Sequence, residues 1–84
     1  MVIDFEGMDP KDAYHILTQT VIPRPVAWVL SENPDGDFNL APFSFFTPIT
    51  SNPPLLMISV GKKPAEGVSK DTRVNIEARK HFVV

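Results

Sequence analysis

Apolar residues near the start of the chain recur with the spacing of one helix face. The stripe occupies positions i, i+3 and i+4, at Ala13, Ile16 and Leu17. This spacing is typical of an amphipathic helix. Asp9 is a suitable N-cap, and Pro10 suits the first helical position because its missing N–H would have no partner there. The pattern predicts a short helix that begins at Pro10 and ends near Thr18 or Gln19.

The next apolar segment has the composition of a strand. Residues 26–31, VAWVLS, are rich in β-branched and aromatic side chains. Residues 33–37, NPDGD, are a strong turn signal because proline, aspartate and glycine each favour turn conformations. A second run begins at Phe38, so we predict a β-hairpin over residues 26–40.

Residues 39–61 mix apolar and aromatic side chains with hydroxyls and with prolines at positions 42, 48, 53 and 54. A helix cannot carry so much proline. The pattern predicts an irregular strand over residues 41–47, a turn over 50–54 and a strand over 55–60. The last strand is continuously apolar, as in a strand that is covered on both faces. Apolar walls with a few hydroxyls are also typical of a ligand pocket.

The last quarter of the chain predicts a loop, a helix and a strand. Residues 61–67, GKKPAEG, form the loop, and Ser69 or Asp71 caps a helix over residues 72–79. Residues 82–84 begin another strand, and the chain ends within it.

This order of elements predicts a mainly β fold with short helices, arranged as an antiparallel barrel or sandwich. The predicted strands are too few to close a barrel of the usual size. We therefore expect residues 1–84 to be a single domain that forms the front part of a longer one.

Charge and composition argue against several classes of protein. The net charge of -2 and the pI of about 5.5 disfavour nucleic-acid binding, including single-strand binding by an open barrel. The chain has no cysteine and only two histidines, so we expect neither disulfides nor a metal site. No apolar run is long enough to cross a membrane. We expect a soluble, cytoplasmic protein.

Basic residues gather in the last quarter of this acidic chain, at Lys62, Lys63, Lys70, Arg73, Arg79 and Lys80. A local basic cluster can hold a small anion such as phosphate. The alternative is that these side chains form an ordinary solvated face, which is the more common case for surface lysines.

Five segments follow one another along the chain: PRPVAWVLS, DGDFNLAPFSFF, SNPPLLMISVG, SKDTRVNI and HFVV. In order and spacing they resemble the flavin reductase-like family of FMN-binding split barrels. The similarity runs from Ile16 onward and covers about the N-terminal half of the usual family domain. The resemblance implies an antiparallel Greek-key split barrel, incomplete in this chain, that forms a homodimer with flavin near the subunit interface.

The resemblance also implies an activity. Family members pass a hydride from NADH or NADPH to N5 of FMN or FAD, and they include flavoredoxins and the reductase components of two-component monooxygenases. A monooxygenase or another redox protein is therefore an expected partner. No catalytic residue is expected, because the two cofactors carry the chemistry. Two alternatives stay open: an FMN-binding electron carrier without enzymatic activity, and a structural β-domain fragment without flavin affinity.

The matching positions imply a set of flavin-binding residues. Backbone groups along the isoalloxazine ring would come from Phe43, Ser44, Phe45 and Phe46. The ribityl chain would lie near Thr50 and Ser51, and the phosphate end would be supported by Ser59, Val60 and Gly61. The phosphate itself would contact Lys70, Asp71 and Thr72 at the start of the second helix.

The residues alone leave several of these roles open. SKDT by itself favours a plain helix cap with a solvated lysine, whereas the family register favours phosphate binding at the helix N-terminus. Ser44 suits either a flavin heteroatom or its own sheet, and strand alternation would direct Phe43 and Phe45 into the core. Arg24 is expected to pair with a carboxylate of the acidic N-terminal segment, and Trp28 to lie in the core or a dimer interface.

Overall fold

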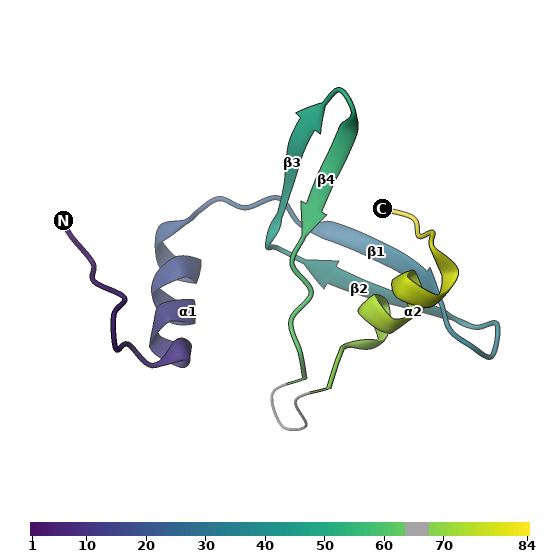
Figure 1. The fold of residues 1–84 in the computed structure, drawn as a ribbon, viewed down its shortest axis with the longest axis horizontal. Helices are drawn as coiled ribbons and strands as arrows, with labels where there is room; N and C mark the ends of the chain where they lie inside the picture. The colour runs from purple at the N-terminus through teal and green to yellow at the C-terminus, as the bar shows by residue number, and fades with distance from the viewer. Residues whose placement is uncertain (64–67) are drawn as a thin grey trace.

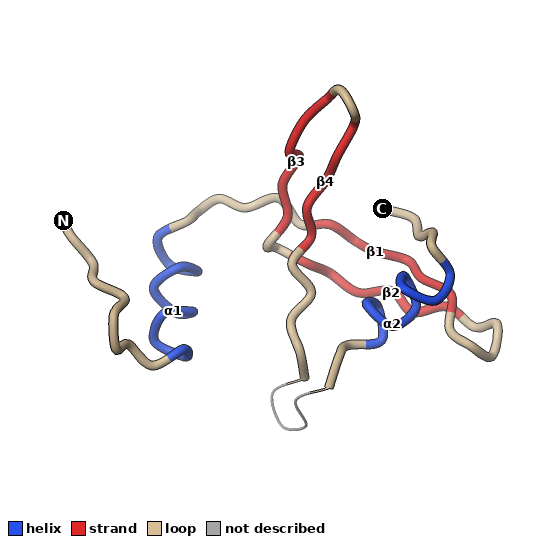
Figure 2. Tube along the Cα trace, in the orientation of Figure 1, coloured by secondary structure: helices blue, strands red, loops and turns tan. Residues whose placement is uncertain are grey.

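The computed structural model describes residues 1–63 and 68–84 of the 84-residue chain. In chain order its elements are α1 (Pro10–Thr20), β1 (Ala27–Glu32), β2 (Phe38–Phe43), β3 (Phe46–Ser51), β4 (Pro54–Ile58) and α2 (Asp71–Arg79). The strands form two antiparallel hairpins, with α2 packed on the first hairpin and α1 set apart (Figure 1). Long connections separate α1 from β1 and β4 from α2 (Figure 2).

Helix α1 forms where it was predicted. The backbone N–H of Lys11 donates a 2.8 Å hydrogen bond to the Asp9 carboxylate, which confirms the N-cap. The helix extends to Thr20, slightly beyond the predicted end. None of its residues is buried, so its apolar stripe does not join a core in the described part of the chain.

The hairpin of β1 and β2 is also confirmed. Its turn is closed by a 2.7 Å hydrogen bond from the Asn33 N–H to the Asp37 carbonyl. Gly36 adopts a φ of +91°, a conformation that side chains with a Cβ rarely accept. Trp28, expected in the core or a dimer interface, is 57% exposed on β1 in this chain, so its assignment to the core is wrong.

The strand predicted over residues 41–47 is wrong. Its first part, up to Phe43, completes β2 by pairing with β1. The chain then bends at Ser44 and Phe45, and β3 begins at Phe46. The alternation expected for this strand is lost at the bend, so Phe43 is buried but Phe45 is not.

The second hairpin joins β3 to β4 through a turn at Asn52 and Pro53, within the predicted turn. The prediction that residues 55–60 are covered on both faces is wrong for the described residues. The hairpin projects away from the other elements, which leaves its apolar side chains largely open to solvent (Figure 1). The exposed fractions are 49%, 54% and 51% for Leu55, Leu56 and Met57.

Helix α2 packs on the first hairpin through polar side chains. Its N-cap is Lys70, which makes no side-chain capping bond, so the prediction of Ser69 or Asp71 as the cap is wrong. Its buried residues are Thr72 and Asn75, which are 2% and 3% exposed. A hydrophobic pattern could not predict this face, because its fully buried side chains are polar, although Ile76 packs against the core beside them.

Hydrogen bonds satisfy both buried side chains of α2. Thr72 Oγ1 accepts a 3.0 Å bond from Asn39 Nδ2 on β2. Asn75 Nδ2 donates to Ser31 Oγ at 3.1 Å and to Asn33 Oδ1 at 2.9 Å. The helix is therefore held in one register, because buried polar groups are costly unless they are paired.

The core is small and lies between the first hairpin and the elements around it. Its buried apolar residues are Ala27, Val29 and Phe43, with Ala41, Phe46, Ile58, Val60 and Ile76 packed against them. The radius of gyration is 15.2 Å, whereas a compact domain of this length would have about 12 Å. The elements thus do not wrap around one centre.

The C-terminal residues pair with the first hairpin. Val83 forms an antiparallel bridge with Leu30, through backbone hydrogen bonds of 2.8 and 3.0 Å, where the sequence predicted a further strand. The loop predicted over residues 61–67 falls partly outside the described residues, at 64–67. Across residues 1–63 and 68–84, the structure contains no helix long and apolar enough to cross a membrane and no cluster of metal-ligating side chains.

Candidate functional site

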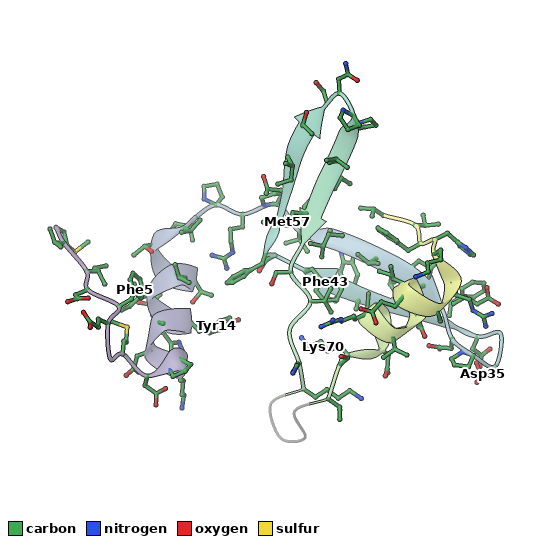
Figure 3. The ribbon with its side chains drawn as sticks, viewed as in Figure 1. Phe5, Tyr14, Asp35, Phe43, Met57 and Lys70 are labelled. Atoms are coloured by element: carbon green, nitrogen blue, oxygen red, sulfur yellow. The ribbon has the colours of Figure 1, made fainter. Side chains whose placement is uncertain are left out.

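A cavity of about 520 Å³ lies where α1, the bend between β2 and β3, and the segments around β4 and α2 meet. We call it the junction cavity. It is lined by Tyr14, Pro42, Phe43, Ser44, Phe45, Ser59, Gly61, Lys62 and Lys70. Its size falls in the usual range for small-molecule sites, about 300–1,000 Å³. Tyr14 reaches it from α1, and Lys70 from the segment that precedes α2 (Figure 3).

The wall near α1 is aromatic. The ring of Tyr14 stacks on that of Phe45, with centroids 5.9 Å apart and an interplanar angle of 28°. The guanidinium of Arg24 lies 5.6 Å from the centre of the same Phe45 ring. Flat apolar surfaces of this kind favour an aromatic ligand.

Arg24 forms no ion pair with the carboxylates of the N-terminal segment, all of which belong to the described residues, so that prediction is wrong. Its Nη1 donates hydrogen bonds of 3.0 and 2.6 Å to the carbonyls of Thr18 and Val21, at the C-terminal end of α1. These carbonyls are free to accept because a helix leaves its last C=O groups without helical partners. Arg24 thus connects the end of α1 to the Phe45 ring.

The bend between β2 and β3 supplies hydroxyls as well as aromatic side chains. The N–H of Ser59, just after β4, donates a 2.9 Å hydrogen bond to the Phe45 carbonyl. This bond brings the hydroxyl-bearing residues Ser44 and Ser59 to one cavity, although they are far apart in the sequence. They are suitable for orienting a polar edge of a ligand.

The opposite wall is cationic. Lys62 and Lys70 both line the cavity, and Lys70 Nζ lies 5.9 Å from the centre of the Phe43 ring. Their segments are held together by a bridge between Lys62 and Ser69 and by a 2.8 Å bond from the Lys63 N–H to the Val68 carbonyl. Two positive charges on one wall suit an anionic group such as a phosphate.

A smaller cavity of about 340 Å³ adjoins this wall and shares Pro42, Phe43 and Lys70 with it. Asp71 and Thr72 line the smaller cavity rather than the junction cavity. The Asp71 carboxylate forms a 3.6 Å ion pair with Lys63. The Thr72 hydroxyl is buried and accepts a hydrogen bond from Asn39.

The structure brings half of the predicted flavin-binding residues together. The junction cavity contains Phe43, Ser44, Phe45, Ser59, Gly61 and Lys70. Phe46 lines a neighbouring groove beside α1 that shares Ser44, Phe45 and Ser59 with the junction cavity, whereas Val60 lines a cavity beside α2. Thr50 and Ser51 lie at the outer end of the second hairpin, away from the junction cavity.

Sequence reasoning missed Tyr14 and Lys62 as cavity residues and Asn39 as the partner of Thr72. Tyr14 stands three positions before Leu17 of the apolar stripe, and that helical spacing was the available signal. Lys62 belonged to the predicted basic cluster, but nothing in the sequence indicated that Lys62 rather than Lys63 would line the cavity.

Comparison with known proteins decides the family. The family model described as "Flavin reductase like domain" matches residues 19–84. The chain belongs to the flavin reductase-like family. All of the junction cavity except Tyr14 falls within the matched segment.

The family assignment agrees with relatives and with solved structures. An uncharacterized protein of Halalkalibacterium halodurans is 42% identical over 84 residues, and the YwrF protein of Bacillus subtilis is 43% identical over 83 residues. Nitrilotriacetate monooxygenase component B from Bacillus cereus matches with a TM-score of 0.86 and 40% identity, over 98% of this chain and 40% of its own. The 2-nitrobenzoate 2-nitroreductase NbaA of Pseudomonas fluorescens matches with a TM-score of 0.85 and 38% identity, over 100% of this chain and 39% of its own.

These matches confirm the predicted fold class. The chain is mainly β with short helices, and it carries part of the flavin reductase split barrel. It spans 40% of the length of each of the two bacterial relatives. The family is one of flavin-related oxidoreductases.

Proposed function

We propose that the junction cavity binds FMN and that the protein takes part in flavin reduction by NADH or NADPH. The observation that carries this proposal is the composition of one cavity, which is lined by aromatic rings, by the hydroxyl-bearing residues Ser44 and Ser59, and by two lysines. FMN has groups to match each of these: a planar aromatic ring, a polar chain and a phosphate. Membership of the flavin reductase-like family supports this ligand over other anionic aromatic compounds.

The isoalloxazine ring would lie against the bend at Ser44 and Phe45, where backbone and hydroxyl groups can meet its polar edge. The phosphate would lie between Lys62 and Lys70. The N–H groups of Asp71 and Thr72, the first two residues of α2, lie next to Lys70 and can add to this anionic subsite, because the first N–H groups of a helix have no helical acceptors. Thr50 and Ser51 have no role in this arrangement, because they lie on another part of the chain.

In this proposal Asp71 and Thr72 support the phosphate subsite indirectly. Asp71 holds Lys63 by an ion pair, and Thr72 fixes the first turn of α2 through its bond from Asn39. Both residues therefore shape the position of Lys70, which directly precedes the helix.

The protein would contribute binding and orientation rather than acid–base chemistry. When bound, FMN supplies the redox chemistry by accepting a hydride from the nicotinamide. The residues at the bend would hold the ring in place and limit access of water to one of its faces.

Further parts of the proposal concern the assembly. We place residues 1–84 in a single flavin reductase-like domain that forms a homodimer, and we take a monooxygenase or another redox protein as the acceptor of electrons. The exposed apolar side chains of the second hairpin support association with another polypeptide. Sedimentation equilibrium tests the homodimer, and a monomer across the micromolar range would contradict it. A cytoplasmic location, where reduced nicotinamide cofactors are available, belongs to the same proposal.

Titration with FMN, followed by the change in flavin fluorescence, tests the central claim. Saturable binding at micromolar concentrations or below is expected, and absence of binding would contradict the proposal. FAD serves as a competitor, and riboflavin as the ligand without phosphate. Oxidation of NADH or NADPH in the presence of FMN then separates a reductase from an electron carrier, which would bind FMN without turnover.

A further inference from the structure

Helix α1 contributes to the junction cavity although nearly all of it precedes the segment that matches the family. The helix covers Pro10–Thr20, whereas the family match begins at residue 19. Its side chain at the cavity is Tyr14. The matched segment alone therefore does not complete the cavity.

Two independent contacts hold α1 against the bend between β2 and β3. Near the middle of the helix, Tyr14 stacks on Phe45 at a centroid distance of 5.9 Å. At its C-terminal end, Arg24 binds the last helical carbonyls and lies 5.6 Å from the same Phe45 ring. Phe45 thus contacts α1 directly through Tyr14 and is linked to the end of the helix through Arg24, so the helix lies beside the residues proposed to meet the flavin ring.

Tyr14 retains a large open surface despite this stacking. It is 56% exposed. It lines the junction cavity, together with Ser44 and the two lysines of the cationic wall. A flat aromatic ligand in the cavity would cover this surface and bury apolar area.

We propose that α1 is a wall of the flavin site and that Tyr14 packs against the isoalloxazine ring. This inference rests on the proposed function, because it names a residue of the same site. Tyr14 acts on the aromatic part of the ligand, and the lysines act on its phosphate. Changes at Tyr14 therefore affect FMN and riboflavin equally, whereas changes at the lysines affect FMN alone.

The composition of the chain allows a direct measurement. It contains one tyrosine, Tyr14, and one tryptophan, Trp28. Protein labelled with fluorotyrosine and fluorotryptophan gives one fluorine NMR signal for each. Added riboflavin shifts the Tyr14 signal by its ring current, while the signal of Trp28, which lies on β1 outside the cavity, stays in place. A Tyr14 signal that does not move under saturating riboflavin overturns the inference.

Variants give a second test. Tyr14→Leu weakens binding of FMN and of riboflavin by the same factor, about fivefold or more, as expected for loss of an aromatic stacking partner. Tyr14→Phe keeps the ring and retains the affinity of the unchanged protein. Gln19→Ala, on the exposed surface of the same helix, is the matched control and leaves both affinities unchanged. If Tyr14→Leu does not fold, the NMR measurement on the unchanged protein still decides the question.

The same binding measurements distinguish failure of the proposed function from failure of the inference about Tyr14. If the unchanged protein binds neither flavin, the proposed function fails and the inference fails with it. If it binds both flavins but Tyr14→Leu binds them as tightly as before, the inference alone is wrong. If Tyr14→Leu weakens FMN but not riboflavin, the residue acts on the phosphate end, and the assignment to the ring is also wrong.

Discussion

Replacing Lys62 or Lys70 by methionine should weaken binding of FMN without weakening binding of riboflavin. Both lysines line the cationic wall of the junction cavity, and FMN differs from riboflavin by its phosphate. Methionine is preferred to alanine because it keeps an unbranched apolar stem. That stem matters at Lys70, whose ammonium lies 5.9 Å from the centre of the Phe43 ring.

The magnitude follows from the exposure of the two lysines. Opposite unit charges about 4 Å apart attract by about 1 kcal/mol in water and by about 4 kcal/mol at an effective dielectric constant of about 20. Both side chains belong to exposed residues, so the lower part of this range applies. We expect each variant to lose about 1–2 kcal/mol of FMN binding free energy, equivalent to about 5- to 30-fold in the dissociation constant.

The assay is a pair of titrations, with FMN and with riboflavin, at low and at moderate salt. The measured quantity is the ratio of the two dissociation constants, which is insensitive to a general loss of folded protein. Salt should reduce FMN affinity in the unchanged protein and should do so less in each variant, because screening acts on the interaction that was removed. Lys11→Met, in the first turn of α1 and outside the cavity, makes the same change in net charge and serves as the control.

Two results would refute this reasoning. Equal weakening of FMN and riboflavin would show that the lysines support the cavity rather than the phosphate. A comparable loss of FMN affinity in Lys11→Met would show that the net charge of the protein, and not the cationic wall, determines the difference between the ligands.

Three further predictions concern the surroundings of the site. Asp71→Asn breaks the ion pair that holds Lys63 beside the cationic wall, so the same titrations should show weaker FMN binding and unchanged riboflavin binding; unchanged or tighter FMN binding would contradict the indirect role of Asp71. Asn75→Ala removes two hydrogen bonds from a buried position and should lower the free energy of unfolding in urea by about 1–3 kcal/mol, whereas a negligible change would mean that α2 does not depend on them. Gly36→Ala, at a φ of +91°, should lower the thermal midpoint through a strain of about 1–2 kcal/mol, and an unchanged midpoint would show that the turn relaxes freely.

The parts of the fold that the sequence predicted are those with strong local signals. The helix at Pro10 had a capping residue and a helical apolar stripe, and the first hairpin had a turn sequence between two apolar runs. Each signal lies within a few residues of the structure that it determines. The family resemblance added the split barrel, which no local pattern could establish.

The errors arose where distant contacts decide the structure. The position of the bend at Ser44 and Phe45 depends on how far β2 pairs with β1. The residues at the bend do not by themselves predict where this pairing ends. The exposure of β4 depends on what packs against it, whereas its composition is equally typical of a covered strand. In both cases the local sequence is compatible with more than one tertiary arrangement.

The candidate site was predictable to the same extent. Residues close together in the sequence, such as Phe43 to Phe45, also lie together in the cavity, and the family register identified them. Tyr14 and Lys62 reach the same cavity from separate segments, so only the tertiary structure reveals their proximity. The positive charge of Lys62 did not predict that this residue lines the cavity. Its neighbour Lys63 has the same charge but forms an ion pair with Asp71 instead.

The polar contacts of α2 connect these observations to the chemistry of the site. Lys70 directly precedes α2, so its position depends on how that helix is fixed to the hairpin. An apolar face would allow small rotations or sliding of the helix at little cost, because hydrophobic contact is not directional. The bonds from Asn39 to Thr72 and from Asn75 to Ser31 permit one register only. In the proposed function, the polar contacts of α2 would therefore hold Lys70 and the first turn of the helix at a fixed place relative to the aromatic bend, so that the phosphate of FMN and its ring could bind at the same time.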